Sequence, residues 1–321
     1  MIKEVTSKTE WDEFVVNSGG HPLQLWGWGE LKSKTGPWKA YRLTVGNHGR
    51  AQVLIRDLPR PFHHMAYIPR GPITAEQGSR QQALDEIAKW AKKQGCIELK
   101  IEPDWPENTP VPKSFRRSKN NIQLGRTVIL DLGKSDEELL ANATKKTRQY
   151  IRKSASSGVT VRETNNVADI KKCLEIYRQT AQRADFNLHG DDYYYSLATL
   201  LGKNNRIFVA ENGGEVVSFL WLIATPAVAF ELYGGVNEQG MELRANYALK
   251  WEAIQQMKQS RVAQYDMNGL LNDGVSNFKL GFSGNTETNL IGTLDKSLSP
   301  LYGLWETVIP LGKKITHSLH K

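Results

Sequence analysis

The segment Tyr265–Gly284, YDMNGLLNDGVSNFKLGFSG, is the most informative part of the chain. An apolar strand at 262–265 runs into it and stops at Asp266. The Asn268-Gly269 pair and the following Asn-Asp-Gly at 272–274 are turn-forming sequences, so they predict a loop directly after the strand. The segment therefore marks the end of a strand in an α/β sheet.

Phe278 and Lys279 follow this loop and are succeeded by a second glycine-rich turn, Gly281–Gly284. Anionic ligands of α/β proteins bind at such strand ends. An aromatic residue and a lysine held between two glycine-rich turns can present one cation there. The alternative is a solvated lysine beside a core phenylalanine.

The residues around this segment predict an order of elements that occurs twice: helix, hairpin, strand, helix and strand. In the second half, Tyr247, Trp251, Ile254 and Met257 share one face of a predicted helix. The predicted ranges in that half are helix 167–183, hairpin 206–223, strand 228–233, helix 244–258 and strand 262–265. In the first half they are helices 7–15 and 26–32, hairpin 40–55, strand 65–68, helix 80–94 and strand 96–101.

Four motifs resemble the Fem family of peptidyltransferases and follow the family's order along nearly the whole chain. They are WGWGELK at 26–32, YIPRGP at 67–72, KTRQYIRKSA at 146–155, and the YGG of 233–235 followed by the segment quoted above. Members of this family use aminoacyl-tRNA to add amino acids to peptidoglycan precursors. The absence of a long coiled-coil arm makes the chain look like the compact members, which add the first residue of a cross-bridge.

The resemblance implies an α/β fold with two acetyltransferase-like domains side by side, each around a mixed central sheet. We expect the first at 1–133, on the acceptor side, with 294–321 packing back on it. We expect the second at 134–293, on the aminoacyl-tRNA side. The capping box Ser135–Glu138 opens the first helix of this domain, which we expect to continue through Ile151.

Composition limits the partners and the compartment. The chain has 321 residues, 40% hydrophobic, with a net charge of +8, which favours polyanionic partners such as RNA, nucleotides or anionic lipid. Cys96 and Cys173 match no metal or redox spacing, and the adjacent His63 and His64 do not form a metal motif. With no signal-peptide pattern and no apolar run long enough to span a bilayer, we expect a cytoplasmic monomer without metal or cofactor, with peripheral contact to the inner membrane face left open.

The resemblance assigns the chemistry to Lys279. This lysine would stabilise the negative charge that develops when the acceptor amine attacks the aminoacyl ester. Phe278 would hold the lysine in place and contact tRNA or peptide. The acceptor amine is itself the nucleophile, and the sequence has no GxSxG element.

For the acceptor, the resemblance implies that Lys32 binds the precursor's diphosphate, with Trp28 on the same helix face. His189 stands where the family has a second phosphate-binding arginine, and a histidine is a weaker, pH-dependent cation. Tyr193 is expected to line the acceptor cleft, and Glu102 replaces a family aspartate near the acceptor peptide.

Tyr233 matches a family tyrosine at a strand end that faces the expected active cleft, with packing in a half-buried core as the alternative. Lys145, Lys146, Arg148 and Arg152 lie on the helix that follows the capping box. Such a basic face attracts phosphates, so we expect it to bind tRNA, with an ordinary solvated helix face as the alternative.

The predicted function is transfer of an amino acid from aminoacyl-tRNA to the stem-peptide amine of UDP-MurNAc-pentapeptide or lipid II. One alternative is an N-acyltransferase that uses acetyl-CoA. Its pyrophosphate-binding loop is missing at both Arg70 and Arg244, where a helix start would carry it. Another is a non-catalytic protein that binds RNA or a membrane surface through the aromatic and lysine residues of 301–321.

Overall fold

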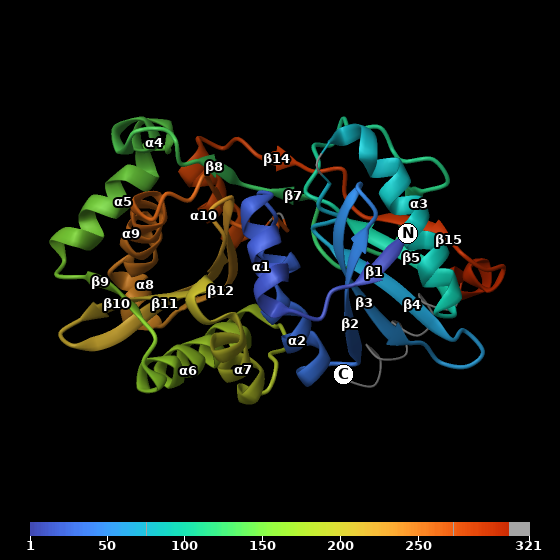
Figure 1. Ribbon diagram of the computed structural model, residues 1–321. Coiled ribbons are helices and arrows are strands. Elements are labelled where there is room, and N and C mark those ends of the chain that lie inside the picture. Colours follow the sequence, from blue (N-terminus) through green and yellow to red (C-terminus); the bar gives the residue numbers. More distant parts are fainter. Residues whose placement is uncertain (75, 272, 308–321) are drawn as a thin grey trace. The chain divides into compact units, whose positions relative to one another are not determined.

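The computed structural model describes residues 1–74, 76–271 and 273–307, which fold into two compact units, each around one mixed sheet (Figure 1). The first unit contains residues 1–18, 23–123 and the described part of 290–321. The second contains residues 19–22 and 124–289.

In the first unit the strand order is β1-β2-β3-β4-β5-β15-β6, and only the β4–β5 pair is parallel. The strands are β1 (Ile2–Glu4), β2 (Trp38–Val45), β3 (Gly49–Asp57), β4 (His64–Pro69), β5 (Cys96–Glu102), β15 (Leu294–Ser297) and β6 (Arg116–Arg117). The helices are α1 (Lys8–Asn17), α2 (Trp26–Thr35) and α3 (Arg80–Lys93).

The two faces of this sheet are covered by different helices. Helix α3 buries Leu84 and Ile87, one turn apart, against Leu43 and Val53 of the sheet. Helix α2 packs on the opposite face so closely that a Cβ added to Gly29 would lie 2.8 Å from that of Ala40. Helix α2 is therefore fixed close to the sheet.

The second unit has the order β8-β13-β12-β11-β10-β9, again with one parallel pair, β12–β13. Its strands are β8 (Ile129–Asp131), β9 (Thr160–Thr164), β10 (Asn205–Asn212), β11 (Glu215–Ala224), β12 (Val228–Val236) and β13 (Gln264–Asp266), with a small separate sheet of β7 (Arg126–Thr127) and β14 (Thr288–Asn289). Its helices are α4 (Asp136–Asn142), α5 (Lys145–Ser156), α6 (Val167–Ala184), α7 (Asp191–Leu201), α8 (Glu238–Glu242), α9 (Ala245–Gln259) and α10 (Gly274–Leu280).

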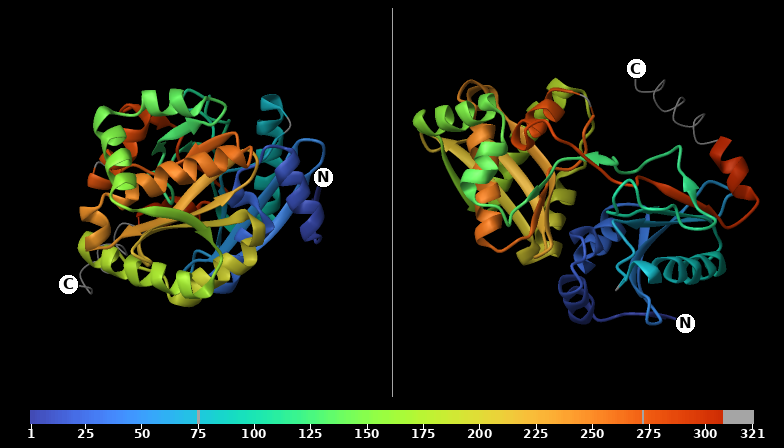
Figure 2. Two further views of the ribbon diagram at one scale, coloured as in Figure 1. Left: turned by 90° about the vertical axis from the view of Figure 1, so that its left-hand side faces the viewer. Right: turned by 90° about the horizontal axis from the view of Figure 1, so that it is seen from above.

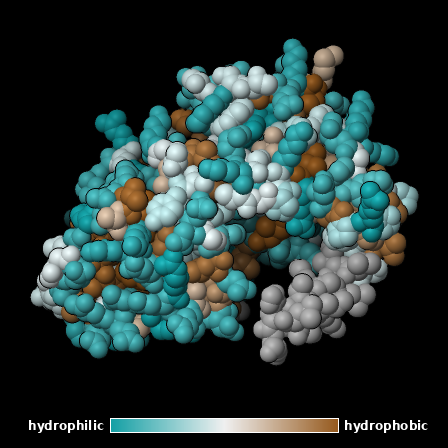
Figure 3. All heavy atoms as spheres, turned by 90° about the horizontal axis from the view of Figure 1, so that it is seen from below, coloured by the Kyte–Doolittle hydropathy of each residue, from teal (hydrophilic) through white to brown (hydrophobic). Residues whose placement is uncertain are grey.

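Helices cover both faces of the second sheet as well (Figures 1 and 2). Two consecutive residues of β11, whose side chains point to opposite faces of the sheet, show the arrangement. Leu220 joins the core beneath α9, whereas Phe219 points the other way, its ring centroid 5.6 Å from that of Tyr177 on α6. Seen from below, hydrophilic side chains dominate the surface of this unit and hydrophobic ones form separate patches (Figure 3).

The structure confirms the predicted α/β class and the repeated order of hairpin, strand, helix and parallel strand. Each sheet is completed by an antiparallel strand from outside the repeated block. In the first unit this strand is β15, from the C-terminal part of the chain, and in the second it is β8. Because β8 pairs with β13, residues 124–133 belong to the second unit. Our boundary after residue 133 was therefore ten residues too late.

The return of the C-terminal segment to the first unit begins at residue 290 rather than 294. Residues 301–307 are helical, and Tyr302 and Trp305 are buried in a cluster with Met65 and Tyr67. Residues 308–321, which we also expected to pack there, lie outside the described residues.

Two local predictions were wrong. The helix opened by the capping box ends at Asn142, and a second helix starts at Lys145 with the Thr144 side chain as its N-cap. The segment around Lys279 is helix α10 rather than loop, because the Asp273 side chain accepts a hydrogen bond from the backbone N–H of Ser276 and so caps a new helix.

Candidate functional site

The parallel strands of the second unit separate where the predicted site lies. Strand β12 pairs with β13 only at Val228–Phe230, and it continues for six more residues, to Val236. Strand β13 ends at Asp266, where the chain turns away through Met267 and Asn268. The sheet therefore opens beside the second half of β12.

A pocket of about 310 Å³ occupies this opening. Phe219 and Leu220 both line it although they face opposite sides of the sheet, so residues from both faces contribute to its wall. The polar lining residues near the strand ends include Glu231, Lys250, Asn268 and Lys279. The remaining walls are mostly apolar or aromatic and include Tyr177, Phe186, Phe219, Tyr233, Leu249, Met267, Val275 and Phe278.

Lys279 lines this pocket, half-buried in the last turn of α10. Its Nζ donates hydrogen bonds to the backbone carbonyls of Asn268 (3.2 Å) and Gly269 (2.9 Å). Burial lowers the pKa of Lys279, the charge of Glu231 opposes this shift, and nearby Lys250 adds to it. An ammonium has three N–H donors, and these carbonyls take two, which leaves one for an oxygen atom in the pocket.

Phe278 also lines the pocket, and neighbouring rings fix its orientation. Its ring centroid lies 4.8 Å from that of Tyr247 and 5.4 Å from that of Phe282, both nearly edge-to-face. The Nζ of Lys250 lies 5.1 Å from the Phe278 centroid. The ring thus packs against α9 through Tyr247 and Lys250 while lining the same pocket as Lys279.

The pocket also contains a buried ion pair that was not predicted from the sequence. The Nζ of Lys250, on α9, lies 2.6 and 2.7 Å from the two carboxylate oxygens of Glu231, on β12, and both side chains are almost fully buried. A signal was present: Lys250 follows Leu249 and precedes Ala253 on the inward side of a helix, and Glu231 interrupts an apolar strand. Buried charges of this kind are expensive unless paired, so the pair fixes α9 to β12.

The predicted residues Tyr233, Tyr193 and His189 come together on the α6–α7 face of this unit. The Tyr233 hydroxyl donates to the Tyr193 hydroxyl at 3.0 Å, and the His189 ring stacks on Tyr193 with centroids 3.9 Å apart. Burial, followed by the proximity of Tyr193, raises the pKa of Tyr233 well above its ordinary value. Tyr233 is therefore a neutral hydroxyl group in the pocket wall.

Helix α7, which carries Tyr193, was also missed. Gly190 precedes it, two aspartates occupy its first turn, and Tyr193, Tyr194 and Leu197 are buried at helical spacing. The three consecutive tyrosines at 193–195 obscure this period in the sequence.

The other predicted substrate residues belong to the first unit. On α2, the Nζ of Lys32 lies 4.4 Å from the ring centroid of the buried Trp28, so the two form the neighbouring pair that their spacing predicts. Glu102 closes β5, only 2% exposed. Glu102 therefore belongs to a strand of the sheet, whereas Lys32 and Trp28 belong to helix α2.

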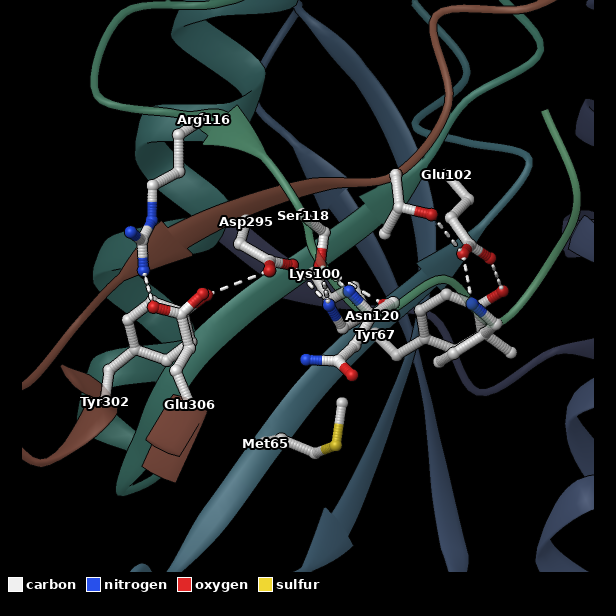
Figure 4. A network of polar contacts seen from close by, with 12 residues as sticks. Met65, Tyr67, Lys100, Glu102, Arg116, Ser118, Asn120, Asp295, Tyr302 and Glu306 are labelled. Carbon is white, nitrogen blue, oxygen red and sulfur yellow. Dashed lines mark hydrogen bonds and ion pairs between the residues drawn. The ribbon is translucent and has the colours of Figure 1, made fainter. Parts of the chain in front are cut away.

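The Glu102 carboxylate is engaged by the protein itself (Figure 4). One oxygen accepts from the backbone N–H groups of Ile122 (2.7 Å) and Gln123 (2.9 Å) and from the Thr293 hydroxyl (2.6 Å). The other accepts from the Tyr67 hydroxyl. In this structure the carboxylate joins four segments of the first unit, a role that the family resemblance did not indicate.

A second buried network lies further along the same strand (Figure 4). Lys100 forms an ion pair with Asp295 of β15, whose other carboxylate oxygen accepts from the Tyr302 hydroxyl at 2.8 Å. Glu98, two residues earlier on β5, is 1% exposed, and no hydrogen bond to its Oε1 is present among the described residues. Burial raises the pKa of Glu98 to about 7.

The four predicted tRNA-binding residues divide into two kinds. Lys145, Lys146 and Arg152 are exposed on α5. Arg148 instead donates from Nη1 to the carbonyls at the end of α4, including those of Leu140 (3.3 Å), Ala141 (3.1 Å) and Ala143. An arginine at this position satisfies carbonyls that the helix end leaves without partners, so its charge is partly committed to holding α4 and α5 together.

The sequence profile of the FemAB family matches residues 6–121, 111–213 and 211–309, so this chain belongs to the FemAB family. It is 29% identical over 218 residues to the lipid II:glycine glycyltransferase of Staphylococcus haemolyticus (strain JCSC1435), which covers 61% of this chain and 52% of that protein. It is 28% identical over 294 residues to the lipid II:glycine glycyltransferase of Staphylococcus aureus (strain MRSA252), with 85% and 66% covered. The chain therefore spans about half to two thirds of the length of these relatives.

Solved structures show the same fold. A crystal structure of FemX superimposes with a TM-score of 0.84 at 21% identity and covers 95% of this chain and 100% of that one. A tandem GNAT protein from the clavulanic acid biosynthesis pathway reaches a TM-score of 0.50 at 13% identity, with 94% and 99% covered. The expected pair of acetyltransferase-like domains is thus confirmed. Among the described residues, no helix combines the length and the apolar character needed to cross a membrane.

Proposed function

We propose that this protein transfers an amino acid from aminoacyl-tRNA to the stem-peptide amine of a peptidoglycan precursor. The observation that carries the proposal is the pocket at the opening between β12 and β13, with the half-buried ammonium of Lys279 in its wall. The family's lipid II:glycine glycyltransferases support glycine as the first donor to test and lipid II as the first acceptor. UDP-MurNAc-pentapeptide is the second acceptor.

The reaction needs stabilisation of a developing oxyanion more than it needs a protein nucleophile. The acceptor amine attacks the ester carbonyl, a C–N bond forms, and the C–O bond to the terminal ribose breaks. The amine loses a proton and the ribose hydroxyl gains one. The remaining N–H of Lys279 would donate to the carbonyl oxygen as it becomes negative, an effect worth roughly 3–4 kcal/mol for one preorganised donor.

The two faces of the pocket suggest separate routes for the two substrates. Helix α5 lies on the α9 side, where Tyr150 of α5 contacts Tyr247 of α9 with centroids 5.0 Å apart. The exposed Lys145, Lys146 and Arg152 would bind the tRNA backbone there. Phosphate contacts of this kind are independent of sequence and depend strongly on salt. This route would bring the aminoacyl end to Lys279 from the α9 side.

The acceptor would reach the pocket from the α6–α7 side, past Tyr233 and Tyr193. Lys32, beside Trp28, would bind the precursor's diphosphate, and His189 would add a pH-dependent contact. For Glu102 we propose an indirect role, because its carboxylate already accepts four hydrogen bonds; it would hold residues 122–123 near the acceptor peptide. A donor carried by tRNA places the reaction in the cytoplasm, with lipid II reached at the inner membrane face.

A transfer assay tests the proposal. Purified protein is incubated with charged bulk tRNA and either lipid II or UDP-MurNAc-pentapeptide. The mass of the muropeptide is then measured by mass spectrometry. The expected result is a gain of one amino-acid residue that disappears when the tRNA is deacylated beforehand. No gain with either acceptor would contradict the proposal. Gain with acetyl-CoA in place of aminoacyl-tRNA would replace it with the N-acyltransferase alternative.

A further inference from the structure

The turn that follows β13 is held in an unusual backbone conformation. Asn268 has a φ of 59°, in the left-handed region that asparagine tolerates better than most residues. Its backbone N–H donates to Asp266 Oδ1 at 2.8 Å, and its own Oδ1 accepts from the N–H of Gly269 at 2.7 Å. Two short-range hydrogen bonds therefore fix the direction of the peptide groups on either side of Asn268.

The amide of Asn268 also bridges the opening in the sheet. Its Nδ2 donates to the backbone carbonyl of Glu231 at 3.0 Å, one residue beyond the last paired position of β12, Phe230. The side chain thus takes a β12 carbonyl near the point where the β13 ladder ends. The neighbouring Gly269 is equally confined, because an added Cβ would collide with the side chain of Leu124.

The result of this geometry is a pair of carbonyl groups that converge on one cation. The carbonyls of Asn268 and Gly269 both accept from Lys279 Nζ, at 3.2 and 2.9 Å. Carbonyl oxygens favour the charged form of an amine, and so do the charges of Glu231, Asp266 and Asp273. Burial of Lys279 and the charge of Lys250 favour the neutral form. The turn therefore both orients the ammonium and helps to keep it protonated.

We propose that Asn268 is a positioning residue that holds Lys279 in the orientation and charge state needed for transfer. This inference rests on the proposed function, in which Lys279 stabilises the oxyanion. Asn268 acts through the two carbonyls, and nothing in the proposal requires it to touch substrate. Without the amide bridge and the left-handed turn, the carbonyls would no longer converge, and the donor left for substrate would point away from the ester.

Three variants distinguish the contribution of the Asn268 amide from that of its left-handed backbone. Asn268→Ala removes the amide and disfavours the left-handed backbone, whereas Asn268→Gly removes the amide but keeps that backbone accessible. Asn237→Ala is the matched control, because Asn237 caps α8 through a side-chain hydrogen bond to Gly240 N at 2.8 Å and belongs to another part of the same unit. It imposes a comparable structural loss without changing the surroundings of Lys279.

The first readout is kinetic. Asn268→Ala is expected to lower kcat at least tenfold, to leave KM for both substrates within about twofold, and to move the alkaline limb of the pH profile to lower pH. Asn268→Gly should recover part of the lost kcat, and Asn237→Ala should match wild type in both respects. A folded Asn268→Ala variant with wild-type kcat and pH profile would overturn the inference.

The second readout does not depend on transfer. The pKa of Lys279 is measured by NMR on protein with ¹³C-labelled lysine, the resonance being assigned by its absence in Lys279→Met. The expected result is a lower pKa in both Asn268 variants and an unchanged one in Asn237→Ala. An unchanged or higher pKa in the Asn268 variants overturns the inference, whereas loss of transfer in all proteins with the expected pKa shift would count against the proposed function alone.

Discussion

Apart from the additional strand β6 in the first unit, the two sheets have equivalent strand orders, but their parallel strand pairs differ in length. In the first unit all six residues of β4, His64–Pro69, pair with β5, and the backbone contact continues to Arg70, whose N–H donates to the Glu102 carbonyl. In the second unit only three of the nine residues of β12 pair with β13. One pair is closed along its length and the other opens after Phe230.

The residues and the space beside the two parallel strand pairs differ as well. Beside the closed pair, polar groups bond to one another: Glu102 to Tyr67 and Thr293, and Lys100 to Asp295 (Figure 4). Beside the open pair there is a pocket with Lys279 in its wall. In this duplicated fold the pocket therefore lies where the parallel strands separate, because the paired part of a ladder leaves no space between its strands.

The strongest test of this comparison is Lys279→Met. The substitution removes the charge at the open pair, so we expect transfer to fall about 10³-fold, equivalent to roughly 4 kcal/mol, with little loss of stability because a half-buried charge disappears. Turnover is measured by the mass of the muropeptide and stability by thermal unfolding. Wild-type turnover in a folded Lys279→Met protein would disprove the role of this lysine.

Lys100→Met is the corresponding substitution in the first unit, where the parallel strand pair is closed. Here we expect the substitution to lower stability. Removing Lys100 leaves the buried Asp295 carboxylate unpaired, which should lower the free energy of unfolding by about 3 kcal/mol or more. Denaturant unfolding measures the loss, and adding Asp295→Asn should recover part of it. The control Lys172→Met breaks an exposed pair with Glu215 and should cost under about 1 kcal/mol. Equal costs in the two variants would refute the distinction.

Glu98 makes the closed unit sensitive to pH. Its pKa of about 7 in the folded protein lies above the ordinary value of 4.5, so its contribution to stability is complete below pH 4.5 and is lost as the pH rises through about 7. Lys100, Asp295, Arg56 and Glu306 also act on its charge. Glu98→Gln should therefore be more stable than wild type at pH 8 by roughly 2–3 kcal/mol, and the advantage should shrink toward pH 5.

Unfolding curves at several pH values test this expectation. Glu215→Gln, at an exposed glutamate, serves as the control and should follow wild type throughout. If the difference between Glu98→Gln and wild type were the same at pH 5 and pH 8, a titrating Glu98 could not be its cause.

The smallest expected effect is on tRNA binding by helix α5 of the second unit. Replacing Lys145, Lys146 and Arg152 by glutamine should weaken tRNA binding and lower the slope of log K against log salt by roughly 2. Arg148 is left in place because it holds the end of α4. Lys171 and Lys172 of α6, changed in the same way, provide the control. An unchanged salt slope in the α5 variant would place the tRNA surface elsewhere.

The sequence was sufficient for the elements that depend on local patterns. The hairpin around Gly46–Gly49 and helix α3 follow from alternation, turn residues and helical spacing, and all were found. The family resemblance located Lys279, Phe278 and Tyr233, which the structure brings together in one pocket.

Features that depend on contacts between residues far apart in the chain could not be predicted from the sequence. Nothing local shows that Leu294 pairs with Ile101, that Lys100 finds Asp295, or that the β13 ladder ends after three residues. The role of Arg148 depends on the break between α4 and α5, which one Thr144 side chain decides by capping. The Glu231–Lys250 pair escaped notice because each residue alone resembles an ordinary surface charge.

The central claim is that the open strand pair of the second unit holds the reacting ester. A crystal structure with a stable 3′-aminoacylamino-3′-deoxyadenosine, in which an amide replaces the ester, tests it most directly. We expect density for the aminoacyl group in the pocket between β12 and α10, with its carbonyl oxygen about 3 Å from Lys279 Nζ. Density for the analogue in the first unit, with this pocket empty, would show that Lys279 does not face the reacting ester.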